Sequence, residues 1–229
     1  MTTPPPDPLA PEARPPFRRS PASSRPRLSG RVLGWALGVG LLVAAVAGYL
    51  LARSRFVFTN SLAAPVRLVL GQNPPRSVAP GETIRQTVAR GSSVLAQWEL
   101  VRPLSADGRP MGSEIRGSIV IAKPSGTIER SARARGSDAD YFAPLISNSS
   151  NDQLRIVVNA GLEGALDCGC AVRPGARRVF IGYYPLYQNS TVRARSGDGR
   201  SATFRDLGPN VTNADGTLGL RFVAGDLRR

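Results

Sequence analysis

An uninterrupted apolar run near the N-terminus is the strongest constraint on this chain of 229 residues. Residues 32–52 read VLGWALGVGLLVAAVAGYLLA and contain no charge. At about 1.5 Å rise per residue, a helix of this length spans the roughly 30 Å hydrocarbon core of a bilayer. Trp35 and Tyr49 lie near its two ends, where amphipathic rings favour the membrane interface. The sequence therefore predicts a single transmembrane helix over residues 32–52.

Arginines are distributed unequally around this run. Arg31 and Arg53 flank it, and five more arginines precede it, whereas few follow closely. Cytoplasmic flanks carry the excess of positive charge, so we expect residues 1–31 in the cytoplasm and the C-terminal region outside the inner (cytoplasmic) membrane. A cleaved secretory signal is the alternative, because Ala45-Val46-Ala47 resembles a cleavage site. The apolar run continues to Leu51, beyond that site, which favours a retained signal anchor.

The segment before the run, residues 1–31, is rich in proline and arginine and has no apolar periodicity. Such a segment cannot bury enough surface to offset the entropy lost on ordering. We therefore predict a disordered cytoplasmic tail.

Beyond the run the pattern changes to short, strand-like segments separated by turn residues. No segment there keeps a 3.6-residue apolar period for three turns, so the region is predicted to be mostly β. Turns are expected at Asp107-Gly108, Gly197-Asp198-Gly199 and Asp215-Gly216. The predicted strands are 66–70, 93–100, 115–122, 154–159, 179–184, 191–195, 201–204 and 218–223.

Two stretches of this region recur. Thr59–Gly71 aligns without gaps on Ser147–Asn159, and Val78-Ala79-Pro80-Gly81 matches Val172-Arg173-Pro174-Gly175. The offset between the matches grows from 88 to 94 residues, so the second copy has an insertion. Cys168-Gly169-Cys170 falls within it, in a glycine-rich stretch that reads as a loop.

These matches predict an extracytoplasmic β-sandwich ectodomain of two duplicated modules, residues 53–142 and 143–229. Asn60 and Asn148 should lie in equivalent turns. In each module a Pro-Gly turn leads into a further strand.

The only cysteines are Cys168 and Cys170. Outside the cytoplasm, two nearby thiols tend to pair, so a local disulfide is expected. Two free or intermolecularly paired thiols, or a redox or metal role, are the alternatives.

Tyr183, Tyr184 and Tyr187 form the densest aromatic cluster of the sequence. They are a candidate interaction patch for sugars or a protein partner. Packing in the core and at strand ends is the alternative.

The charged and catalytic residue types limit the chemistry. Histidine is absent, which excludes Ser-His-Asp and Cys-His sites. Lys123 is the only lysine, so a Ser/Lys hydrolase is a remote alternative that would need it. We expect no catalytic residue, no metal site and no cofactor.

The formal net charge is +14, of which residues 53–229 carry +10. A basic surface suits an anionic partner, although scattered arginines often form only a solvated face. We therefore expect a non-enzymatic, single-pass envelope protein that contacts the bilayer and presents its β-modules to a protein partner or braces an assembly. A binder of anionic envelope polymer or lipid is the alternative, and no nucleic acid is expected.

Overall fold

The computed structural model describes residues 30–51, 53–89, 93–122, 126–136, 140–162 and 165–229. Almost all of the predicted tail, and Lys123, lie outside the described residues. The chain divides into two units, residues 1–47 and 48–229, and each is described by itself.

Helix α1 (Gly30–Leu51) covers the apolar run. Its described side chains are exposed, including Trp35 at 78% and Leu41 at 72%. Within the part of the chain that the structure describes, no helix is found that is long and apolar enough to cross a membrane. The transmembrane helix therefore stays a prediction.

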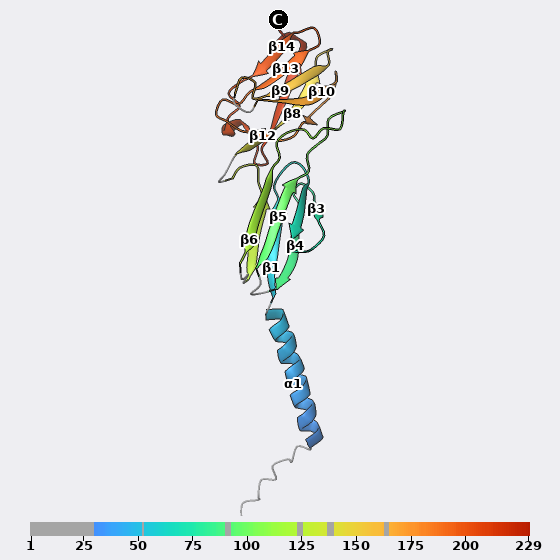
Figure 1. Ribbon diagram of the computed structural model, residues 1–229, viewed down its shortest axis with the longest axis vertical. Helices are drawn as coiled ribbons and strands as arrows, with labels where there is room; N and C mark the ends of the chain where they lie inside the picture. Colours follow the sequence, from blue (N-terminus) through green and yellow to red (C-terminus); the bar gives the residue numbers. More distant parts are fainter. Residues whose placement is uncertain (1–29, 52, 90–92, 123–125, 137–139, 163–164) are drawn as a thin grey trace, which may run out of the picture. The chain divides into compact units, whose positions relative to one another are not determined.

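The rest of the described chain is mostly β, as predicted (Figure 1). Its strands form two groups along the sequence. The first strand group comprises β1 (Arg53–Asn60), β2 (Val66–Leu70), β3 (Arg76–Val78), β4 (Thr83–Ala89), β5 (Val94–Leu100), β6 (Arg116–Ile121) and β7 (Thr127–Ala132). The second strand group comprises β8 (Tyr141–Ser149), β9 (Leu154–Val158), β10 (Leu166–Val172), β11 (Val179–Phe180), β12 (Tyr184–Pro185), β13 (Val192–Ser196), β14 (Ser201–Phe204) and β15 (Thr217–Val223), with short 3-10 turns η1 (Pro209–Val211) and η2 (Ala224–Asp226).

The strands pair in the same way in both groups. In the first, β1 pairs antiparallel with β4 and parallel with β7, and a second sheet has the order β3-β2-β5-β6. In the second, β8 pairs antiparallel with β11 and β12 and parallel with β15, and the other sheet has the order β10-β9-β13-β14. Each strand of the first group thus has a counterpart with the same partners, and β11 with β12 takes the place of β4.

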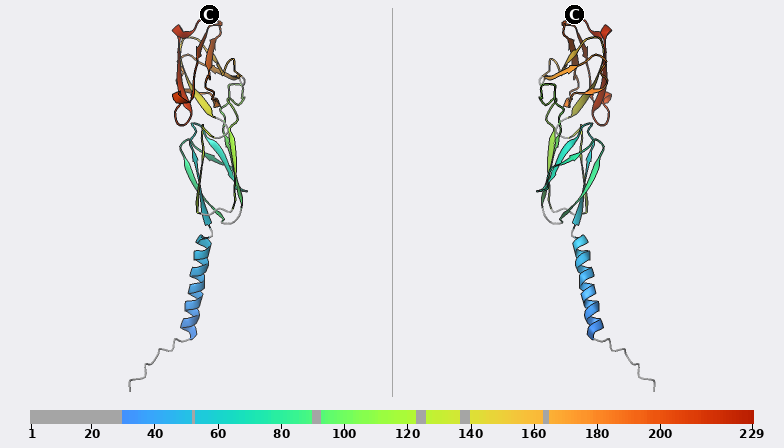
Figure 2. Two further views of the ribbon diagram at one scale, coloured as in Figure 1. Left: turned by 90° about the vertical axis from the view of Figure 1, so that its left-hand side faces the viewer. Right: turned by 90° about the vertical axis from the view of Figure 1, so that its right-hand side faces the viewer.

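Each group has its own hydrophobic core. In the first, Phe56 and Phe58 of β1 belong to one buried cluster with Val66 and Leu68 of β2, which lies in the other sheet. Alternate residues of these strands point inward, as strand geometry requires. The second cluster likewise draws on both sheets of its group. Two sheets that share a core pack face to face, which is consistent with a β-sandwich (Figure 2).

A buried asparagine lies at the end of the first strand of each group, as the last residue of β1 and the penultimate residue of β8. The Asn60 side chain is fully buried; its Nδ2 donates to the carbonyls of Ala64 and Val78, each at 2.9 Å. Its Oδ1 accepts from the amide of Leu62 at 3.0 Å. One side chain thereby ties together the end of β1, the turn into β2 and the end of β3.

Asn148 makes the same three contacts in the second group. Its Nδ2 donates to the carbonyls of Asp152 at 2.7 Å and Val172 at 2.9 Å, and its Oδ1 accepts from the amide of Ser150 at 3.0 Å. The backbone hydrogen bonds correspond as well, because the amides of Gly81 and Gly175 donate to the carbonyls of Asn60 and Asn148, respectively. We call each set of contacts an asparagine clamp.

The two groups meet where the counterpart of β4 is interrupted. Between β11 and β12 the chain leaves β8, and Tyr183 enters the core cluster of the first group. Its hydroxyl accepts from the amide of Ala63 at 2.7 Å and donates to the carbonyl of Asp215 at 2.6 Å. A Cβ on Gly112 or Gly182 would lie within 3 Å of backbone across this junction. The backbones there are therefore in direct contact.

Replacing Asn60 or Asn148 by alanine is expected to lower the free energy of unfolding by about 2–4 kcal/mol. The substitution leaves two buried carbonyls and one amide without their partner. Chemical denaturation of each variant measures the loss. Asn73→Ala, in an exposed turn, is the matched control and should change stability by less than about 0.5 kcal/mol. Losses of similar size in all three variants would contradict the importance of the clamps.

Candidate functional site

A groove of about 830 Å³ lies on the outward face of β9 and β13 in the second strand group. Arg155 and Arg195 are exposed there, because the residues on either side of each in its strand point into the core. We call it the Arg155–Arg195 groove. Its charged lining residues are Asp152, Arg155, Asp167, Arg195 and Asp198.

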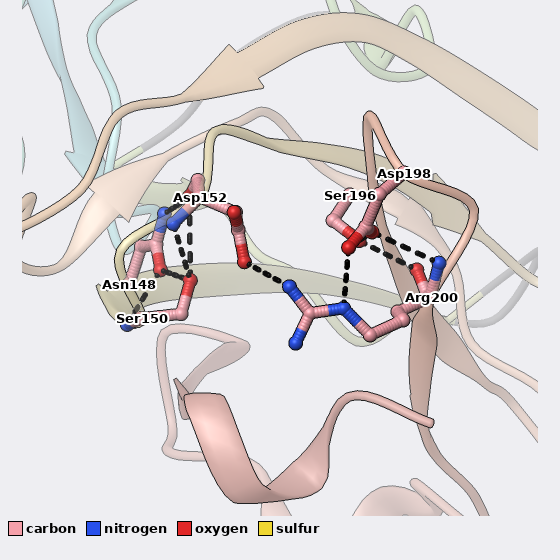
Figure 3. Close-up of polar contacts among 6 residues, drawn as sticks. All are labelled: Asn148, Ser150, Asp152, Ser196, Asp198 and Arg200. Atoms are coloured by element: carbon pink, nitrogen blue, oxygen red, sulfur yellow. Dashed lines mark hydrogen bonds and ion pairs between the residues drawn. The ribbon is translucent and has the colours of Figure 1, made fainter. Parts of the chain in front are cut away.

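An ion-pair network fixes one rim of this groove (Figure 3). The Arg200 guanidinium contacts Asp198 at 2.6 Å and Asp152 at 2.8 Å. Asp152 belongs to the turn that begins at Asn148, and Asp198 to the hairpin turn between β13 and β14. Arg200 therefore links two turns that are far apart in the sequence.

The hairpin turn repeats a pentapeptide of the first group. Ser196-Gly197-Asp198-Gly199-Arg200 matches Ser105-Ala106-Asp107-Gly108-Arg109. In each, the serine hydroxyl donates to the aspartate at 2.5 Å and the arginine contacts the same carboxylate. The repeat was visible in the sequence, although only its Asp-Gly turns were identified. The arginines differ, since only Arg200 reaches a second carboxylate.

The surroundings of Asp198 keep it ionised. The Ser196 hydroxyl, and then Arg200, donate to its carboxylate and lower its pKa to about 2. A carboxyl with so low a pKa holds no proton near neutral pH, so it cannot serve as a general acid there. The network is suited to holding the rim in place, not to proton transfer.

The two arginines on the groove floor face each other. Arg155 and Arg195 are register partners on the antiparallel strands β9 and β13. Like charges directly opposite each other in a sheet are destabilising. No hydrogen bond or ion pair is found for either guanidinium among the described residues. Neither guanidinium is thus paired directly with a carboxylate of the described protein, although Asp152, Asp167 and Asp198 line the same groove.

A second groove, of about 750 Å³, lies over β1, β4 and β7 in the first strand group. We call it the arginine groove. Among the described residues, none of its arginines pairs with a carboxylate, although Glu129 also lines the groove. The arginines that line it are Arg85, Arg130, Arg133 and Arg135.

The structure joins Cys168 to Cys170 through a disulfide, with their Cα atoms 5.1 Å apart. Both side chains are buried in the second core cluster. The prediction that Cys168 and Cys170 lie in a loop is wrong, because both residues belong to strand β10. The register of β10 against β9 shifts between Asp167 and Ala171, so the edge strand accommodates the extra residues as an irregularity.

The tyrosine cluster is mostly internal. Tyr183 is fully buried and Tyr184 is 1% exposed, whereas Tyr187 is 39% exposed. The Tyr184 hydroxyl donates to the carbonyl of Ile181 at 2.9 Å. A partner could therefore contact Tyr187 but not the other two rings without rearrangement, and Tyr183 serves the junction between the groups.

The predicted membrane-interface residues are described only in part. Trp35 is exposed on α1. Arg31 and Tyr49 belong to α1 and Arg53 begins β1, but their side chains lie outside the described part of the structure.

Comparison with known protein families finds no family model that matches the chain, and no curated protein matches it.

Stability should fall between pH 10 and pH 12 because of Tyr183. Burial raises the pKa of its hydroxyl to about 12 from 10. The unfolded chain therefore loses this proton first, and the stabilising effect is present below pH 10 and lost as the pH rises through 12. The lost contribution is about 2–3 kcal/mol. Chemical denaturation over this range should show a shallower decline for Tyr183→Phe than for the wild type, and equal slopes would contradict this role.

Proposed function

We propose that this protein is a non-enzymatic, membrane-anchored envelope protein whose two extracytoplasmic β-modules bind a partner or brace an assembly. The observation that carries the proposal is a helix that contains a charge-free run from residue 32 onward, with exposed apolar side chains, and precedes a mostly β region with charged grooves.

The anchor is supported by the sequence and by the exposure of α1. Residues 38–48 of the helix are exposed and apolar or glycine. Exposed apolar surface of this kind is unfavourable in water and favourable in hydrocarbon. The arginine excess before the helix supports a cytoplasmic N-terminus.

A duplicated ectodomain is supported by the shared strand pairing and by the two asparagine clamps. We propose two modules, predicted from the sequence at residues 53–142 and 143–229; β7 ends at Ala132 and β8 begins at Tyr141, so the link between the strand groups lies at residues 133–140. A binding role without turnover is supported by the lack of histidine in the sequence and by the fixed ionisation of Asp198.

The topology can be tested in a bacterial host with a reporter that is active only outside the cytoplasm. Fusion after Arg229 should give activity, and fusion before Met1 should give none. The protein should stay in the membrane fraction, and deletion of residues 32–52 should keep the reporter inactive, because the chain then lacks its signal anchor. An inactive C-terminal fusion would contradict the topology. A mature chain that begins near Gly48 would contradict the retained anchor.

The second candidate function is binding of an anionic envelope polymer or anionic lipid, and the arginine groove favours it. Its four arginines gather on one face of the first strand group, where an even spread would have favoured a solvated surface.

Replacing Arg85, Arg130 and Arg133 together by serine should abolish salt-sensitive retention on anionic polymer or on anionic lipid vesicles. Each arginine attracts the polyanion by a charge interaction that salt screens. The matched control replaces Arg109, Arg173 and Arg177, which are also exposed, and changes the net charge equally. Equal losses in the two triple variants would show that net charge alone, not the groove, retains the protein.

A further inference from the structure

The two strand groups differ in charge at one shared position of their sheets. In the first group, Glu99 on β5 lies opposite Arg67 on β2 and Arg116 on β6. Glu99 therefore has the opposite charge to the register partner on each neighbouring strand, which is the favourable arrangement for directly opposed residues. In the second group the same position holds Arg195 on β13, which lies opposite Arg155 on β9 and Ser201 on β14.

The same part of the second group has gained further polar residues. Counted from the clamp asparagines, Ser150 and Asp152 take the places of Leu62 and Ala64. Asp152 holds Arg200, and Ser150 donates to Asn148 at 2.7 Å. Leu62 and Ala64 cannot make these side-chain contacts, so the link between the clamp turn and Arg200 in Figure 3 belongs to the second group.

The carboxylates around the groove are engaged, whereas the arginines are not. Asp152 and Asp198 accept from Arg200, and Asp167 accepts from the amide of Gly169 at 2.9 Å. Neither Arg155 nor Arg195 has such a contact in the described structure. Two guanidinium groups on facing strands can donate in parallel to the oxygens of one anion.

We propose that Arg155 and Arg195 bind a single oxyanion, a carboxylate or phosphate group of a ligand that lies in the Arg155–Arg195 groove. The oxyanion supplies the charge that Glu99 supplies in the first group. The three carboxylates on the groove lining disfavour a long polyanion, because its further charges would meet them. The proposal deepens the proposed binding role and is independent of the membrane anchor and of the arginine groove.

The test uses the full-length chain in a non-ionic detergent. Its unfolding temperature is measured with increasing inorganic phosphate, and separately with acetate, at an ionic strength held constant with sodium chloride. A ligand that binds only the folded state raises the unfolding temperature. We expect a rise with phosphate or acetate that chloride does not give, and the comparison of the two identifies the preferred oxyanion.

Arg195→Glu recreates the charge pair of the first group. It should raise the unfolding temperature in chloride, since it removes the repulsion, and should lower the affinity for the oxyanion by about tenfold or more. Arg155→Gln should lower the affinity for the oxyanion to a similar extent. Near-ultraviolet circular dichroism verifies that each variant is folded.

Two further variants separate this site from the rest of the surface. Glu99→Arg places a third arginine between Arg67 and Arg116 in the first group and should lower the unfolding temperature in chloride. The triple serine variant of the arginine groove should keep the phosphate or acetate response of the wild type. The proposal is overturned if neither oxyanion raises the unfolding temperature beyond chloride, or if Arg195→Glu responds as the wild type does. Neither result would bear on the membrane topology, which the reporter fusions test.

Discussion

The buried asparagine clamps are the interaction on which the β structure most depends. In each strand group one amide side chain satisfies the backbone groups of three segments that would otherwise be buried without partners. Unsatisfied polar groups are costly in a protein interior, so no apolar residue can replace Asn60 or Asn148 without loss. The clamp also fixes where the turn into β2 or β9 begins. The register of the following strands, and hence which side chains face outward, depends on that position.

A shared scaffold with different outward residues separates structural from functional positions. The core and the clamp have the same structural role in both groups and are formed by similar residues. Arg195 and Asp152 differ in charge from their counterparts Glu99 and Ala64, although the backbone around them is alike. A change that introduces repulsion without helping the fold needs another explanation, and a bound anion supplies one.

The sequence predicted the β class and the bounds of β2, but not every strand. The residues of β2 alternate between apolar and polar, whereas Phe142–Ile146 of β8 are all buried and show no alternation. β10 was missed because Cys168-Gly169-Cys170 looks like a loop. The sequence could not predict that Arg155 and Arg195 lie opposite each other, because this depends on the register of the strands across the sheet. The Ser-x-Asp-Gly-Arg repeat could have been found, since both copies stand in the sequence.

The interruption between β11 and β12 makes the two groups one structure. If β11 and β12 were one continuous strand, as β4 is, Tyr183 would pair with β8. Instead the chain leaves β8 between them, and Tyr183 packs in the core cluster of the first group. Its hydroxyl is both acceptor and donor there, so separating the groups would leave Ala63 and Asp215 without a buried partner. Arg135 adds a second link by donating to Pro209 and Thr212 of the second group. Residues 48–229 form one compact unit, and these contacts join the two groups within it, so loss of Tyr183 or Arg135 would remove interactions that both groups share.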